Sequence, residues 1–90
     1  MKEIKFTAQY RRDLKRLQRQ GKEFDAMRRV IQLLEKSIPI PPEFYDHALK
    51  GKWKGRRELH LESDWLLIYR TTDEAIYLER TGSHSELLNR

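Results

Sequence analysis

The spacing of apolar residues divides the chain into strands and helices on either side of one long loop. Residues 2–7, 57–61 and 75–81 alternate apolar and polar side chains, which is typical of strands with one buried face. Residues 65–71, WLLIYRT, are apolar almost throughout, as in a central strand covered on both faces. Because short polar turns separate the three segments of the C-terminal half, the pattern predicts an antiparallel meander.

Two further segments have the helical period. Residues 8–20 carry an apolar stripe between Thr7, a candidate N-cap, and Gly21, a common C-terminal stop. A second stripe extends over residues 23–37 and cannot continue through Pro39. Because the turn between them is short, we expect the two helices to form an antiparallel hairpin packed against the sheet.

Residues 38–55 show neither period and contain three prolines and two glycines. They predict a long ordered loop, and a loop of this length in a compact domain tends to be functional. The element order is therefore β-α-α-loop-β-β-β. It predicts a single small α+β domain over residues 1–90, in which a helix hairpin packs on an antiparallel sheet.

Alternation also assigns the two faces of the first meander strand. Leu59 and Leu61 should point to the core, and Glu58 and His60 should point away from it.

Charge adds an expectation about partners. The 90 residues carry 19 Lys and Arg against 14 Asp and Glu, a net charge of +5, and 38% are apolar, enough for one small core. Residues 1–37 carry +6 and residues 38–57 carry +3, whereas residues 58–90 carry −4. This asymmetry favours an anionic partner, although basic residues that only solubilise a helix face would give a similar pattern.

Composition excludes several classes of protein. There is no cysteine, which rules out disulfides, thiolate zinc sites and cysteine nucleophiles. The longest apolar run covers residues 65–69, far below the roughly 20 residues that span a bilayer, so no membrane partner is expected. The charged N-terminus lacks the apolar stretch of a signal peptide, and we expect a cytoplasmic protein.

Three histidines are the strongest candidates for chemistry. His47 lies in the long loop, His60 in a predicted strand and His84 in the C-terminal segment. Imidazoles that ionise near neutral pH suit metal-free RNA cleavage, in which one group removes the proton of the attacking 2′-hydroxyl and another protonates the leaving 5′-oxygen. A guanidinium such as Arg80 or Arg57 would stabilise the charge that develops on the phosphate.

These assignments have ordinary alternatives. A lone surface histidine is usually only solvated, and Asp64, which is able to orient an imidazole, would in a hairpin turn also hydrogen-bond its own backbone. Three histidines and an aspartate form a familiar set of zinc ligands as well. The sequence contains neither HExxH nor two histidines four residues apart, so no metal and no other cofactor is expected.

A basic stretch inside the long loop is the candidate RNA-binding segment. It alternates cations with small residues and one tryptophan, which lets the backbone approach phosphates and an indole stack on a base. Its members are Lys50, Lys52, Trp53, Lys54, Arg56 and Arg57. The alternative for Trp53 is structural, with its ring buried to anchor the loop on the sheet.

Two segments, DHALKGKWKGRRELHLESDWLLIYR and LERTGSHSELL, resemble the YafQ-like branch of the RelE/ParE superfamily. These proteins are the toxins of bacterial type II toxin–antitoxin pairs. The N-terminal FTAQYRRDLKRL fits the same superfamily more broadly, so the resemblance covers the whole chain. It implies one RelE-like toxin domain with a helix hairpin on one side of a small sheet.

The resemblance also implies a function. It indicates a ribosome-dependent endoribonuclease that cleaves mRNA in the ribosomal A site and is held inactive by a cognate antitoxin, which alone supplies any contact to DNA. The catalytic positions carry over as His47, His60, Asp64 and His84, with Arg80 as a candidate for phosphate stabilisation.

The sequence departs from the family pattern at three positions. Ala48 and Ser63 stand where relatives often have proline, and Leu88 stands where an aromatic residue often closes the site. We expect activity to be kept and codon preference to differ.

Two other functions are compatible with parts of the sequence. A non-enzymatic RNA-binding or ribosome-binding module would block translation by occupancy, and its binding would weaken steeply with salt. The superfamily also contains gyrase poisons, but blocking a topoisomerase would not need three imidazoles.

Overall fold

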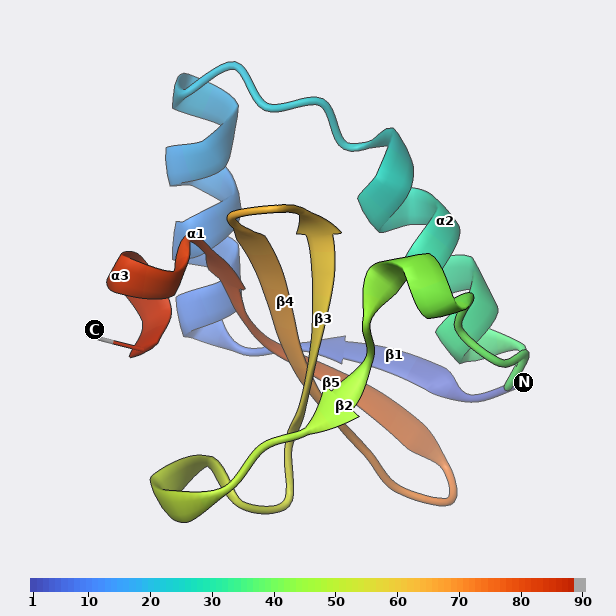
Figure 1. Cartoon of the computed structure of the whole chain (residues 1–90). Helices are drawn as coiled ribbons and strands as arrows, with labels where there is room; N and C mark the ends of the chain where they lie inside the picture. Colours follow the sequence, from blue (N-terminus) through green and yellow to red (C-terminus); the bar gives the residue numbers. More distant parts are fainter. Residues whose placement is uncertain (89–90) are drawn as a thin grey trace.

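The computed structural model describes residues 1–88, except for the side chain of Leu88, and shows helices packed on one five-stranded sheet (Figure 1). The expected α+β class is confirmed. The helices and strands are β1 (Glu3–Phe6), α1 (Ala8–Arg19), α2 (Asp25–Glu35), β2 (His47–Ala48), β3 (Arg57–Glu62), β4 (Trp65–Thr71), β5 (Ala75–Gly82) and α3 (His84–Leu88). Within this described part, no helix has the length and apolar character needed to cross a membrane.

The strand order is β1-β5-β4-β3-β2. Strands β2 to β5 are antiparallel, as the meander prediction required, with β4 at the centre. The sheet is nevertheless mixed, because β1 lies parallel to β5, with Glu3 opposite Ala75 and Phe6 opposite Leu78. A parallel neighbour needs a crossover connection, and the chain between β1 and the rest of the sheet contains both α1 and α2.

Both faces of β4 are buried, which explains its continuous apolar run. Trp65, Leu67 and Tyr69 belong to the main core under α1 and α2. Leu66 and Ile68 point to the opposite face, where Leu87, Leu49 and Trp53 cover them. Trp53 therefore anchors its loop on the sheet, which agrees with the structural alternative for this residue.

The helix hairpin begins and ends close to the predicted positions. The Thr7 hydroxyl caps α1 by accepting a hydrogen bond from the Tyr10 backbone N–H at 3.0 Å. The two helices run in opposite directions (Figure 1), and the Tyr10 hydroxyl donates to Sδ of Met27 at 3.0 Å. Gly21 has the positive φ, 77°, that a helix stop of this kind favours.

The long loop contains more regular structure than its sequence predicts. It forms two short 3₁₀ turns, Pro42–Phe44 and Gly51–Trp53, on either side of β2. Strand β2 pairs with β3, with His47 opposite Glu58. Two residues are too few to show a period of two, so the sequence pattern could not reveal this strand.

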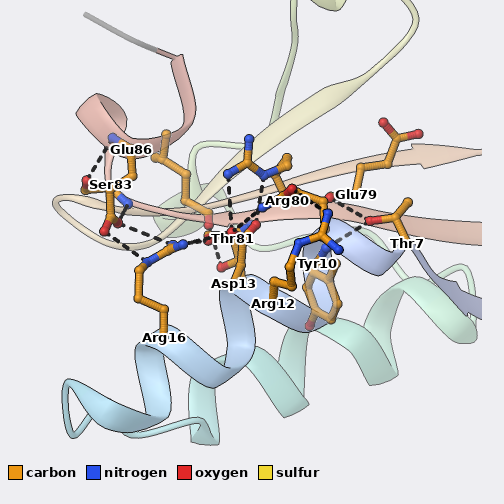
Figure 2. Close-up of polar contacts among 12 residues, drawn as sticks. Thr7, Tyr10, Arg12, Asp13, Arg16, Glu79, Arg80, Thr81, Ser83 and Glu86 are labelled. Carbon is orange, nitrogen blue, oxygen red and sulfur yellow. Dashed lines mark hydrogen bonds and ion pairs between the residues drawn. The ribbon is translucent and has the colours of Figure 1, made fainter.

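Residues 79–82 of β5 have no neighbouring strand on the side away from β4, because β1 pairs only with residues 75–78. Side chains of α1 and its cap bind these backbone groups instead (Figure 2). The Thr7 hydroxyl donates to the Glu79 carbonyl at 2.8 Å, and Asp13 accepts from the Thr81 N–H at 3.0 Å. Arg16 donates to the Thr81 carbonyl at 3.0 Å. Along residues 79–82, side chains of α1 and its cap therefore make hydrogen bonds that a neighbouring strand would otherwise make.

Candidate active site

The three histidines come together in a row, which we call the histidine row. The ring centroids of His47 and His60 are 6.1 Å apart, and those of His60 and His84 are 5.6 Å apart. They come from β2, β3 and the start of α3, three elements far apart in sequence. The convergence that metal-free RNA cleavage requires is therefore present.

Asp64 orients His84 at one end of the row. One carboxylate oxygen, Oδ1, accepts hydrogen bonds from the His84 backbone N–H at 3.0 Å and from ring Nδ1 at 2.9 Å. The bond from the His84 backbone, followed by the bond from the ring, lowers the pKa of Asp64 below its usual value. Because Nδ1 donates to Asp64, the tautomer is fixed and Nε2 remains available to act on a substrate.

His47, at the other end, has an acceptor at each ring nitrogen. Nδ1 lies 2.8 Å from the Tyr45 carbonyl, and Nε2 lies 3.1 Å from Oε2 of Glu58. Each ring nitrogen of His47 therefore faces a hydrogen-bond acceptor. These two contacts fix the orientation of the ring.

Glu58 is the site residue that sequence reasoning missed. It points away from the main core, as expected, yet it is only 4% exposed because it lies against His47. Its second oxygen, Oε1, is buried without a hydrogen-bond partner among the described residues. The signal was available in the sequence, since Glu58 and His60 are two apart on one strand and so share a face.

The same corner has the donors of a metal site. One ligand atom each from His47, Glu58 and His60 lies within 4.8 Å of the others. Imidazole nitrogens with a carboxylate oxygen suit zinc and copper. Acid–base chemistry and metal binding would therefore compete for the same groups.

Arg80 belongs to a second cluster, at the residues of β5 that have no neighbouring strand (Figure 2). Its Nε and Nη2 donate to the two oxygens of Asp13 at 2.8 and 3.2 Å, while its third nitrogen points away from that carboxylate. Burial alone would raise the pKa of Asp13, but hydrogen bonds from Arg80, the Thr81 N–H and Arg16 hold it below its usual value. No contact among the described residues joins Arg80 to the histidine row.

Arg16 links this cluster to the helical turn that carries His84. Ser83 and Glu86 form a capping box, in which the Glu86 N–H donates to Ser83 Oγ at 3.2 Å and the Ser83 N–H donates to Glu86 Oε1 at 2.9 Å. Nε of Arg16 lies 3.0 Å from Oε2 of Glu86. A Cβ on Gly82, whose φ is 154°, would come within 2.5 Å of Nη2 of Arg16, so a side chain there would displace this guanidinium.

The predicted RNA-binding segment divides into free and paired cations. Lys50, Lys52 and Lys54 are exposed. Arg56 instead pairs with Glu79, and Arg57 pairs with Asp46 at 3.2 Å. The tyrosine hydroxyl of Tyr69 also donates to Asp46, at 2.7 Å, so this carboxylate fixes the residue before His47 to the sheet. Leu88 ends α3, and its side chain lies outside the described part of the chain.

Comparison with known proteins gives one family. The model for the bacterial toxin of type II toxin–antitoxin systems, YafQ, matches residues 2–89. An mRNA interferase toxin YafQ from Escherichia coli K12 is 39% identical over 87 residues, which are 96% of this chain and 95% of that protein.

Solved structures agree. In the E. coli DinJ–YafQ toxin–antitoxin complex, a chain 39% identical superimposes with a TM-score of 0.88 and 96% coverage of both chains. A copper-bound L66S mutant toxin from Helicobacter pylori, 40% identical, has a TM-score of 0.93 over 97% of this chain and 99% of that one.

Proposed function

Because this chain belongs to the YafQ family of type II toxins and is an mRNA interferase, an endoribonuclease, we propose that it cleaves mRNA in the ribosomal A site without a metal ion. The observation that carries the proposal is the histidine row, with His84 held by Asp64 so that Nε2 is free. The scissile phosphate lies over His60, between the two outer histidines. The catalytic residues are His47, His60, Asp64, His84 and Arg80.

The reaction needs no group beyond these side chains. One of His60 and His84 accepts the proton of the 2′-hydroxyl, which attacks the adjacent phosphorus, and the other protonates the 5′-oxygen as its bond to phosphorus breaks. The products are a 2′,3′-cyclic phosphate and a 5′-hydroxyl. His47 positions the substrate, and the third nitrogen of Arg80 stabilises the charge on the phosphate oxygens.

The partners follow from charge and from the family. Lys50, Lys52 and Lys54 are exposed and available for phosphates of mRNA or rRNA. The E. coli relative is found in complex with DinJ, and a cognate antitoxin is the corresponding partner here. An acidic or amphipathic antitoxin segment would cover the basic surface and exclude mRNA, and any contact to DNA would come through the antitoxin.

The direct test is primer extension on a defined mRNA in a purified translation system, with and without ribosomes. We expect new 5′ ends only when both toxin and ribosomes are present, and their sequence will give the codon preference. Cleavage of free mRNA at the same sites would contradict ribosome dependence. Arrested translation with intact mRNA would favour the occupancy mechanism instead.

Metal independence has its own expected result. With Mg²⁺ kept at the level that the ribosomes need, we expect a chelator selective for zinc and copper to leave the cleavage rate unchanged, because His60 and His84 do the proton transfers themselves. Added Zn²⁺ or Cu²⁺ should inhibit, because it would bind at His47, Glu58 and His60. The measurement is the single-turnover rate with this selective chelator, then with graded metal. Loss of cleavage in the chelator that Zn²⁺ restores would show a metal-dependent enzyme.

A further inference from the structure

Tyr45 is an exposed aromatic residue beside the histidine row. Its side chain is 66% exposed, although its ring centroid lies only 4.8 Å from that of His47 and 5.5 Å from that of His60. Large aromatic rings are normally buried, since they contribute strongly to a core. An exposed ring at this position therefore calls for a functional explanation.

The backbone of Tyr45 holds the ring in place. Its φ and ψ are 49° and 50°, a left-handed conformation that is unfavourable for a residue with a bulky side chain. In this conformation its N–H donates to the Pro42 carbonyl at 3.0 Å, and its own carbonyl accepts from His47 Nδ1 at 2.8 Å. One residue thus orients His47 and fixes a ring next to it.

A hollow adjoins this ring. Its volume is about 380 Å³, within the range of small-ligand sites. Its apolar walls are Phe44, Tyr45 and Leu61, and its polar walls are His60, Ser63 and the carboxylates Glu43 and Glu62, which could accept hydrogen bonds from the amino groups of a base. A flat, partly polar group would fit these surroundings. Because His60 lines the hollow, a group attached close to the scissile phosphate would reach it.

We propose that the hollow is a nucleobase subsite, in which a base of the mRNA next to the scissile phosphate stacks on Tyr45. Single-stranded RNA is commonly recognised by such stacking, and every base offers a face for it. The proposal rests on the proposed function, because it places the scissile phosphate at His60. Tyr45 then contributes substrate affinity and nucleotide preference, whereas the histidines carry out the chemistry.

Kinetics on ribosome-bound mRNA test the role of the ring. We expect Tyr45→Ala to raise the KM for mRNA by about 5- to 150-fold, the range for loss of one base stack, with a smaller change in kcat. Tyr45→Phe should retain the wild-type KM. The matched control is Phe6→Ala, which removes another exposed aromatic side chain, 47% exposed, at the opposite edge of the sheet.

A second readout does not depend on cleavage. The mRNA carries 2-aminopurine beside the cleavage site and a 2′-deoxyribose at the attacking position, so that it binds but is not cut. Stacking should change the fluorescence with wild type and Tyr45→Phe, but not with Tyr45→Ala. Unchanged fluorescence with wild type, or an equal change with Tyr45→Ala, would overturn the proposal.

These outcomes separate the subsite from the proposed function. If the fluorescence depends on Tyr45 while normal mRNA stays intact, the subsite stands and the nuclease mechanism fails. If cleavage and fluorescence are normal in Tyr45→Ala but binding of the antitoxin is weakened, Tyr45 contacts a protein and the nucleobase subsite is wrong.

Discussion

Replacing His84 with alanine should lower the single-turnover rate of mRNA cleavage by about 10²- to 10⁴-fold, the usual contribution of one acid–base group. The loss is expected because His84 Nε2 is the free nitrogen of the histidine that Asp64 orients. Binding to ribosomes should change little, because the substitution removes one partly exposed side chain, 37% exposed, and leaves the lysines of the long loop in place. Primer extension over a time course gives the rate.

The control for this substitution is Arg28→Ala. Arg28 lies on α2, its side chain is 69% exposed, and it pairs only with the neighbouring Asp25 among the described residues. We expect this variant to cleave at the wild-type rate. A fully active His84→Ala variant would show that His84 is not part of the mechanism. A similar loss of cleavage rate in both variants would indicate a general effect of lower stability.

Replacing Asp13 with asparagine should lower the free energy of unfolding by about 3 kcal/mol, as expected when one partner of a buried ion pair is removed. Asp13 is fully buried and accepts hydrogen bonds from Arg80, Arg16 and the Thr81 N–H. An amide would remove the counter-charge of Arg80 and leave Arg16 paired with Glu86 alone. Urea unfolding followed by circular dichroism measures the change.

The chain supplies a closely matched control. Asp25 and Arg28 repeat the i, i+3 spacing of Asp13 and Arg16, but the Asp25 side chain is 89% exposed. Asp25→Asn should therefore change the free energy of unfolding by no more than about 0.5 kcal/mol. Equal effects of the two substitutions would show that the cluster around Asp13 contributes no special stability.

The same carboxylate predicts a dependence on pH. The pKa of Asp13 is lowered in the folded protein, whereas an unfolded aspartate has a pKa of about 3.9. Its stabilising effect is complete above the unfolded value and is lost as the pH falls through the folded value. Wild type should therefore lose stability more steeply below about pH 4 than Asp13→Asn does.

These two aspartates also show what the sequence could not reveal. Both precede an arginine by three residues on a predicted helix, and no local pattern distinguishes them. The difference arises because Asp13 meets Arg80 and Thr81, more than 60 residues further along the chain. Local periodicity predicted the helices, the meander and the central strand β4. The parallel pairing of β1 with β5 could not be predicted in this way, because it joins residues about 70 apart in sequence.

The site divides in the same way. Residue type was enough to select the histidines and Asp64, and the structure brings His84 to Asp64 as a catalytic role would require. The roles of these residues stay predictions. Glu58 was missed because a carboxylate on an alternating strand is usually solvated, and its burial comes from His47 on the separate strand β2. The sequence also did not reveal that Arg56 and Arg57 form ion pairs with Glu79 and Asp46.

The use of α1 as a substitute strand affects how the protein can associate with itself. If α1 moves away, residues 79–82 of β5 become an unprotected strand edge. Such an edge readily pairs with a strand of another molecule. The side chains of Thr7, Asp13 and Arg16 therefore protect this strand edge as well as stabilise the fold. Acid that protonates Asp13 should accordingly yield oligomers joined through β5, and not only a dispersed unfolded chain.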